Sequence, residues 1–425
     1  MDRENVWKQY RSILQEELAT AFGCTEPVAI AYAAAVARQK LGAMPEKMEI
    51  SCSGNIIKNV KSVIVPNADG MRGIEVAALL GAVGGKPEKK LAVLIDITGE
   101  DIDETRKLLE KRICTVHALQ GGSNLHIIVD VTAGEHQAKV EILGGHTHIV
   151  CIEKDGAVVF QQPYEEEGQT RDYDCLTFDG ILDYAIHGPL DDELVHLLLR
   201  QADLNRTIAE EGLKGEYGAA VGRTLLDSYG TDVKIRAAAY AAAGSDARMS
   251  GCELPVVINS GSGNQGITVS MPVLQYAQEL NVSQERLCRA LTLSNLVAIH
   301  LKRLVGRLSA FCGVVSASCG SGAGITFLCG GTRDQICNTV INTLGNVSGI
   351  VCDGAKPSCA AKICASVQAA ILGHEMAMRG RCFHSGDGII KENIEETIRS
   401  VAKIGRDGMK ETDQVVLDIM TDCAF

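Results

Sequence analysis

The cysteines towards the C-terminal end are the residues with the clearest capacity for chemistry. Seven of the chain's sixteen cysteines fall within residues 312–364. Cys352 and Cys359 flank a turn that contains glycine and proline, and a helix is predicted to begin near Cys359 and run towards Met378. Thiolates at the start of a helix suit an anionic metal cluster, because free backbone N–H groups there point towards negative charge.

The spacing of these cysteines leaves two interpretations open. No Cys-x-x-Cys pair occurs in the region, so the pattern does not match a zinc site, whereas thiolates on glycine-rich loops are compatible with an iron–sulfur cluster. Alternatively, the thiols are small buried groups in a helical core, since free cysteine is among the most buried residue types. The density of cysteines alone favours the second interpretation.

Cys24 is a separate candidate for chemistry. A helix is predicted over residues 25–41, with Thr25 as its N-cap and Glu26 in its first turn. The amide field at such a position lowers the pKa of a thiol, so Cys24 could act as a base or a nucleophile. A purely structural cysteine is the alternative.

Small polar residues follow the first predicted strand. Ser53, Asn55 and Asn59 are predicted to lie on a loop between two strands, and Asn67 follows Pro66 at the end of the next strand. Such groups at strand ends suit recognition of an amino-acid carboxylate and ammonium. Ordinary turn chemistry would explain them equally well.

Two further motifs have weaker functional readings. Residues 261–266 formally match Gly-x-Gly-x-x-Gly, but no βαβ unit surrounds them. We therefore expect a glycine loop near substrate or cluster, with Asn264 as a hydrogen-bonding residue, and no dinucleotide site. His146 and His148 fall on one side of a predicted strand and could chelate a metal, but without a nearby carboxylate or thiol we expect polar surface histidines.

The elements that must position these residues indicate an α+β protein. It is predicted to have a mainly helical catalytic domain (176–425), an inserted two-layer α/β domain (46–175), and N-terminal helices (1–45) packing on the catalytic domain. The inserted domain has helices predicted at residues 71–83 and 102–113. Its strands are predicted at residues 48–52, 60–65, 91–97, 125–131, 138–143, 146–153 and 157–161.

Composition excludes several classes of partner. The chain has 41 basic and 53 acidic residues, a net charge of −12 and only 4% aromatic residues, which argues against binding to nucleic acid. The N-terminus has no apolar signal segment, and no apolar run approaches the ~18 residues of a membrane span. We therefore expect a cytoplasmic protein with no membrane partner and with reduced thiols.

Together these segments resemble a known family, the L-cysteine desulfidases (UPF0597), which is related to the iron–sulfur L-serine dehydratases. The resemblance extends along essentially the whole chain. The segments that carry it are Gly-Cys-Thr-Glu-Pro at 23–27, Ser-Gly-Asn-Ile-Ile-Lys-Asn at 53–59, residues 65–73, and the set Cys312, Cys352 and Cys359.

The resemblance implies a function and its residues. It implies a [4Fe–4S] cluster held by Cys312, Cys352 and Cys359, with one iron left open for substrate, and Cys24 as the acid/base residue. The implied reaction is β-elimination of L-cysteine to sulfide, pyruvate and ammonia, without pyridoxal phosphate. The candidate substrate-binding residues are Thr25, Ser53, Asn55, Asn67 and Asn264.

Other functions remain open at this point. L-Serine ammonia-lyase activity would differ only in the leaving group, although the pentapeptide at 23–27 favours the cysteine branch. A non-enzymatic iron–sulfur redox sensor would also explain the thiols. In some related serine dehydratases a C-terminal cysteine plugs the open iron, and Cys423 stands at a corresponding place near the end of the chain. The partner is expected to be an amino acid, and a homo-oligomer is compatible with the sequence.

Overall fold

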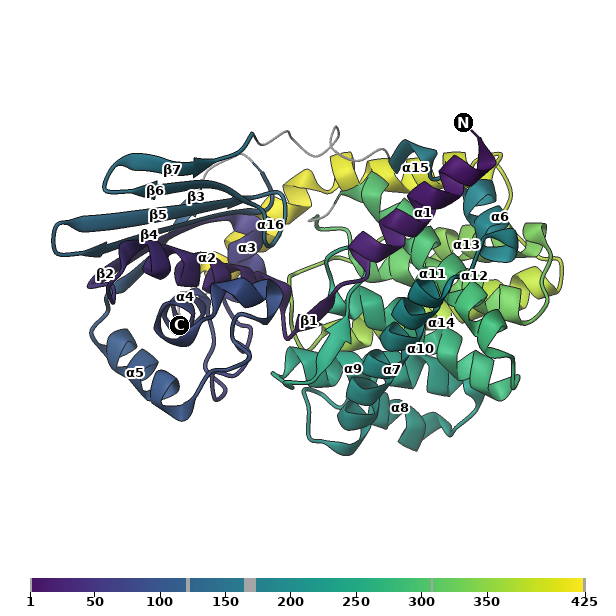
Figure 1. Ribbon diagram of the computed structural model, residues 1–425. Coiled ribbons are helices and arrows are strands. Elements are labelled where there is room, and N and C mark those ends of the chain that lie inside the picture. The colour runs from purple at the N-terminus through teal and green to yellow at the C-terminus, as the bar shows by residue number, and fades with distance from the viewer. Residues whose placement is uncertain (1, 120–122, 164–172, 307–308, 423–425) are drawn as a thin grey trace.

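Two units, each with its own hydrophobic core, lie side by side in the structure (Figure 1). The computed structural model describes residues 2–119, 123–163, 173–306 and 309–422. One unit is helical, and the other is built on a sheet. The predicted α+β class is confirmed.

The helical unit contains the second half of the chain and the first helix. Its inner helices, such as α10 and α12, are buried along almost their whole length. None of the described helices is both long and apolar enough to cross a membrane. The helices of this unit are α1 (Arg3–Glu17), α6 (Phe178–His187), α7 (Asp192–Lys214), α8 (Val221–Tyr229), α9 (Val233–Met249), α10 (Gly263–Glu279), α11 (Gln284–Val305), α12 (Gly313–Leu328), α13 (Arg333–Val347), α14 (Cys359–Met378) and α15 (Ile394–Lys403), with the short helical turns η2 (Tyr173–Cys175) and η3 (Ile404–Gly408). Helix α16 (Lys410–Asp422) follows them in the chain and contacts both η3 and α3 of the other unit.

The α/β unit is a two-layer structure, with helices α2 and α4 packed on its sheet. Its strands have the order β3-β2-β4-β5-β6-β7, in which β2 and β3 are parallel and the other neighbours antiparallel. Alternate residues of β2, β4, β5 and β6 are buried, because helices cover one face of the sheet. The bounds are β2 (Lys47–Ser53), β3 (Cys114–Leu119), β4 (His126–Ala133), β5 (His136–Leu143), β6 (Ile149–Lys154), β7 (Ala157–Gln161), α2 (Thr25–Leu41), α3 (Gly54–Val60), α4 (Ile74–Gly84), η1 (Pro87–Ala92) and α5 (Gly99–Glu110).

Two of the predicted strands are wrong. Residue 60 ends helix α3, and residues 61–65 form a turn with one isolated bridge at Ile64. Residues 91–92 end η1, and residues 93–97 do not pair as a strand. Both segments hold buried apolar side chains, and a short apolar run reports burial without distinguishing a strand from a packed turn. Strand β3 was not among the predicted strands, although it pairs with β2 along its whole length.

The N-terminal helices divide between the two units, which differs from the prediction that both pack on the catalytic domain. Helix α1 contacts α6, α7 and α11, whereas α2 packs against α4, β4 and β5. Residues 28–37 of α2 are all buried because this alanine-rich stretch has no polar face to leave in water. Between the two helices, β1 (Thr20–Phe22) pairs with β8 (Pro255–Val257) of the helical unit.

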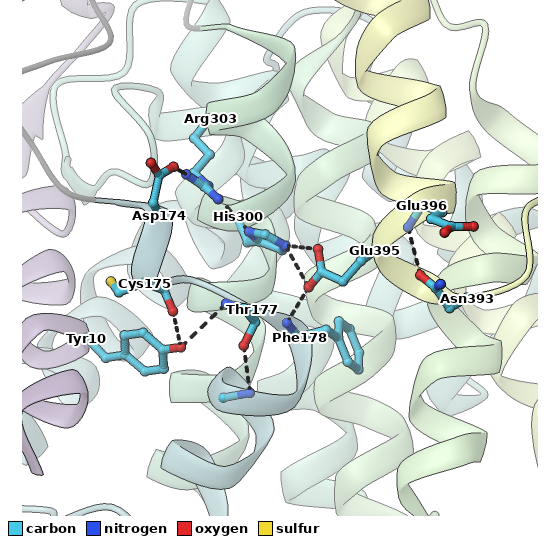
Figure 2. Close-up of polar contacts among 11 residues, drawn as sticks. Tyr10, Asp174, Cys175, Thr177, Phe178, His300, Arg303, Asn393, Glu395 and Glu396 are labelled. Carbon is cyan, nitrogen blue, oxygen red and sulfur yellow. Dashed lines mark hydrogen bonds and ion pairs between the residues drawn. The ribbon is translucent and has the colours of Figure 1, made fainter. Parts of the chain in front are cut away.

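A polar cluster fastens α11 to neighbouring helices (Figure 2). His300 of α11 contacts the carboxylate of Glu395 at 3.0 Å, and the backbone N–H of Phe178 donates to the same carboxylate at 2.6 Å. Burial opposes ionisation of Glu395, but the hydrogen bond from His300 lowers its pKa. Close by, the Tyr10 hydroxyl donates to the carbonyl of Cys175 at 2.7 Å. The end of α11, which supplies a lysine to the site described below, is thereby held in place.

The crossing of α2 and α4 gives a test of the packing. A Cβ atom at Gly81 would lie 2.2 Å from the carbonyl oxygen of Ala31, so the helices could not keep their present separation. We expect Gly81→Ala to reduce the free energy of unfolding by about 1–3 kcal/mol, measured by urea denaturation. Gly99→Ala is the control, because no atom lies within 4 Å of the added Cβ. Equal stability of the two variants would contradict this packing.

Candidate active site

A cavity of about 110 Å³ between the two units collects most of the candidate residues. The four candidate thiols all line it: Cys24, Cys312, Cys352 and Cys359. Among the candidate substrate-binding residues, Thr25, Asn55 and Asn264 line it as well. Side chains that are far apart in the sequence therefore face one space.

Backbone pairing brings Cys312 and Cys352 together. The N–H of Cys312 donates to the carbonyl of Ile350 at 3.0 Å, and that of Cys352 donates to Ala310 at 2.7 Å, which joins the two segments antiparallel. Cys359 begins α14 at the predicted position, and its thiol accepts a hydrogen bond from the backbone N–H of Lys356 at 3.5 Å. The long separation between Cys312 and Cys352 in sequence is thus closed by a single bridge.

The protein environment favours a thiolate at Cys352. A hydrogen bond from the Cys312 thiol, acting against burial, lowers the pKa of Cys352 to about 6, and the Lys58 and Lys302 ammonium groups contribute to the same shift. The same hydrogen bond raises the pKa of the Cys312 thiol. Burial raises the pKa of Cys359, but the Lys356 N–H opposes that shift. Negative charge on sulfur is therefore met by nearby positive groups.

These thiols suit a cluster better than a single ion. Within the described parts of the chain, no three Cys, His, Asp or Glu side chains are grouped so as to hold one metal ion. In a [4Fe–4S] cube each thiolate binds a different iron, so its ligands lie farther apart than those of a single ion. Three thiols around one cavity, with lysines and a backbone N–H beside them, fit that donor set.

Cys24 differs from the sequence-based expectation. Cys24 itself is the N-cap of α2, a position predicted for Thr25, but burial raises the pKa of Cys24, and the negative charge of Glu26 adds to the increase. The Cys24 thiol donates to Glu26 Oε2 at 3.2 Å, while the positive charge of Arg248 acts in the opposite direction. The helix N-terminus alone therefore does not make Cys24 a thiolate, because burial and a neighbouring carboxylate outweigh it.

Glu26 is the centre of the hydrogen-bonding around Cys24. Its carboxylate accepts hydrogen bonds from Thr25 Oγ1 and Asn59 Nδ2, each at 3.0 Å, and lies 4.0 Å from His146 Nε2. Burial would raise the pKa of Glu26, but the interactions with His146 and Cys24 lower it to about 2. Glu26 is therefore held as a carboxylate next to the Cys24 thiol.

Arg248 links the helical unit to the segment that carries Cys24. Its guanidinium donates to the Gly23 carbonyl at 2.9 Å and to Asn264 Oδ1 at 3.2 Å. Both side chains are buried, so this contact closes one wall of the cavity. Asn264 thus lies in the site, as predicted, and is tied there by a residue that the sequence did not suggest.

The polar residues after β2 lie on a helix, which corrects the predicted loop. Asn55 and Asn59 are one turn apart on α3, and both line the cavity together with Lys58. Ser53 ends β2 and lines a larger adjoining cavity of about 400 Å³. Asn67 lines neither cavity, and its amide donates to the carbonyl of Leu94 at 2.7 Å.

Comparison with known proteins identifies the family. Residues 101–418 match the serine dehydratase alpha chain family. A UPF0597 protein of Lachnoclostridium phytofermentans is 53% identical, with 98% of this chain and 100% of the relative covered. This chain belongs to the UPF0597 family, which is related to the serine dehydratases. UPF0597 proteins of Desulfitobacterium hafniense (49% identical, 99% of this chain and 98% of the relative) and Bacteroides fragilis (44% identical, 98% and 99%) are similar over the same extent.

Several residues that line the cavity of this UPF0597 protein were not predicted from its sequence. His146 was expected at the surface, yet its side chain is only 11% exposed and faces Glu26. Nothing local distinguishes Arg248 or Lys58 from surface residues, because their burial depends on the opposite unit. Glu26 alone had a signal, since it stands within the pentapeptide. Cys423, the candidate plug, lies outside the described residues.

The contact between Cys24 and Glu26 predicts how the thiol reacts. Glu26→Gln removes the adjacent negative charge, so the pKa of Cys24 should fall and its thiolate fraction should rise. We expect iodoacetamide to alkylate Cys24 about three- to tenfold faster at pH 8, as followed by mass spectrometry of the peptide. Glu253→Gln makes the same charge change at an exposed position and should have no effect. An unchanged rate in Glu26→Gln would refute the assigned cause of the high pKa.

Proposed function

We propose that this serine dehydratase-related protein catalyses β-elimination of L-cysteine to sulfide, pyruvate and ammonia. One observation carries the proposal: Cys24 lines the same cavity as Cys312, Cys352 and Cys359. A proton-transfer group and a set of soft metal ligands are what this elimination requires, because the α-hydrogen is a weak acid and the thiol a poor leaving group.

Cys312, Cys352 and Cys359 are the proposed ligands of a [4Fe–4S] cluster. When bound, the cluster would supply a Lewis-acidic iron that offsets negative charge on the leaving group. The protein's own contribution is to hold the three sulfurs around the cavity and to place the Lys58 and Lys302 charges near Cys352. No pyridoxal phosphate is needed in this scheme.

Proton transfer is assigned to Cys24. Deprotonated Cys24 would take the α-proton of the substrate, and Glu26 Oε2, which accepts the Cys24 thiol hydrogen bond at 3.2 Å, orients the sulfur. His146 and Asn59, on the other carboxylate oxygen, hold Glu26 in place. The aminoacrylate product tautomerises and is hydrolysed to pyruvate and ammonia. Thr25, Asn55 and Asn264 line the cavity where the substrate would bind.

L-Serine is the second candidate substrate. The match to the serine dehydratase alpha chain family favours it, and the same residues would act with hydroxide as the leaving group. The Gly-Cys-Thr-Glu-Pro segment supports cysteine as the first choice. Parallel pyruvate assays on both amino acids decide between them, and a bound cluster without pyruvate from either would point to a redox sensor.

The ligand assignment is tested by Cys352→Ala. We expect anaerobically purified Cys352→Ala to lose most of its iron and sulfide and all measurable pyruvate formation, because one of three protein ligands is removed. Iron and sulfide analysis and the pyruvate assay are the measurements. Cys364→Ala, on helix α14 after Cys359 and outside the cavity, should retain both properties. Full iron content and activity in Cys352→Ala would defeat the assignment.

The role of Cys24 is tested by Cys24→Ser. A serine hydroxyl is a much weaker acid than a thiol, so kcat should fall by about 10²–10⁴-fold while iron content stays unchanged. Steady-state kinetics and iron analysis on one preparation separate these effects. Retention of near-normal kcat would remove Cys24 from the proton-transfer step.

A further inference from the structure

The C-terminal helix α16 places a carboxylate in a two-point clamp at the edge of the catalytic cavity. Asp413 of α16 accepts a hydrogen bond from the Lys58 ammonium on Oδ1 at 2.5 Å and one from the Asn55 side-chain amide on Oδ2 at 2.9 Å. Both oxygens of one carboxylate are thus bound by two different donors. Lys58 and Asn55 both line the 110 Å³ cavity, whereas Asp413 lines only the adjoining 400 Å³ cavity.

The clamp is preorganised on a buried helix. The Lys58 side chain is 2% exposed, so its charge requires an anionic partner. The Asp413 side chain is 20% exposed, so solvent reaches it. α16 comes from the helical unit and packs across α3 (Figure 1). A single carboxylate of a terminal helix therefore neutralises a lysine that belongs to the cavity wall.

Acceptors for an ammonium group lie beside the clamp. The side-chain oxygens Asn55 Oδ1 and Asn59 Oδ1 are buried and have no hydrogen-bond partner, and their amide nitrogens are committed to Asp413 and Glu26. An unmade hydrogen bond at a buried acceptor costs about 1–3 kcal/mol, so these oxygens suit a bound N–H donor. One face of α3 thus offers donors for a carboxylate and acceptors for an ammonium.

We propose that Lys58 and the Asn55 amide bind the α-carboxylate of the amino-acid substrate, and that the Asp413 carboxylate competes with the substrate for this clamp. The proposal rests on the proposed function for the identity of the substrate. The acceptors Asn55 Oδ1 and Asn59 Oδ1 receive its ammonium. Asn59 is bonded to Glu26, so the clamp lies one helical turn, about 6 Å along the axis, from the residue that contacts Cys24.

Because of this competition, substrate binding disfavours the docking of α16 on α3, and docking disfavours substrate binding. An α-carboxylate that takes the two donors leaves Asp413 without its partners, and α16 then loses these two hydrogen bonds to α3. Conversely, removing the charge of Asp413 frees the clamp. Asp413→Asn keeps the size of the side chain while weakening its hydrogen bonds to the ammonium.

Binding of L-alanine tests the clamp apart from catalysis, because L-alanine has both charged groups and no β-leaving group. We expect anaerobic holoenzyme with Asp413→Asn to bind L-alanine about tenfold more tightly than wild type by calorimetry, since a competing carboxylate is removed. Glu411→Gln makes the same charge change at an exposed position of α16 and should match wild type. Lys58→Met should weaken binding at least about tenfold, with thermal unfolding as the check on its folding.

Hydrogen exchange in the unmodified protein gives a second readout that a merely structural contact would not change. L-Alanine should speed amide exchange in residues 410–422, and it should do so less in Asp413→Asn. An L-alanine affinity unchanged by Asp413→Asn, no detectable L-alanine binding, or no effect of L-alanine on α16 would each overturn the proposal. If these binding results are as expected but neither L-cysteine nor L-serine yields pyruvate, the clamp stands and the proposed reaction fails.

Discussion

The cavity depends on one short junction, residues 20–25, being held between the two units. β1 pairs with β8 of the helical unit, and the chain then turns at Gly23, whose φ is +67°. A Cβ at Gly23 would lie 2.1 Å from Cγ of Pro66, so only glycine allows this approach. The Gly23 carbonyl accepts from Arg248, and the next residue is Cys24. The position of the proton-transfer candidate therefore follows from a close backbone contact.

The cavity shifts the pKa values of two of its thiols in opposite directions. Glu26 and burial raise the pKa of Cys24, whereas the Cys312 hydrogen bond, with the charges of Lys58 and Lys302, lowers that of Cys352. The charged groups that cause these shifts are separated in space. The Glu26 carboxylate lies in the first turn of α2, and the Lys58 and Lys302 ammonium groups lie near Cys352, one of the proposed ligands. The lowered pKa of Cys352 suits its proposed role as a metal ligand, because a thiol binds metal as the thiolate.

Buried charges also explain why the two units must stay together. Lys58 of α3 and Arg248 of α9 are both buried; Lys58 pairs with Asp413 of α16, and Arg248 donates to the Gly23 carbonyl at the junction. Separating the units would break the Lys58–Asp413 pair, at a cost of about 3–5 kcal/mol for a broken buried pair. The contacts that close the site therefore also stabilise the interface between the two units.

The sequence by itself determined the α+β class, the mainly helical character of residues 176–425, several individual helices and five strands of the sheet, because residue periodicity and capping are local. It also singled out the four thiols, through the pentapeptide and the resemblance. Only the tertiary structure decided that residues 54–60 are helical, that α2 belongs to the sheet, and that His146 and Lys58 face the cavity. Burial and the resulting pKa shifts arise from groups brought together across two units, and no local pattern encodes a partner hundreds of residues away.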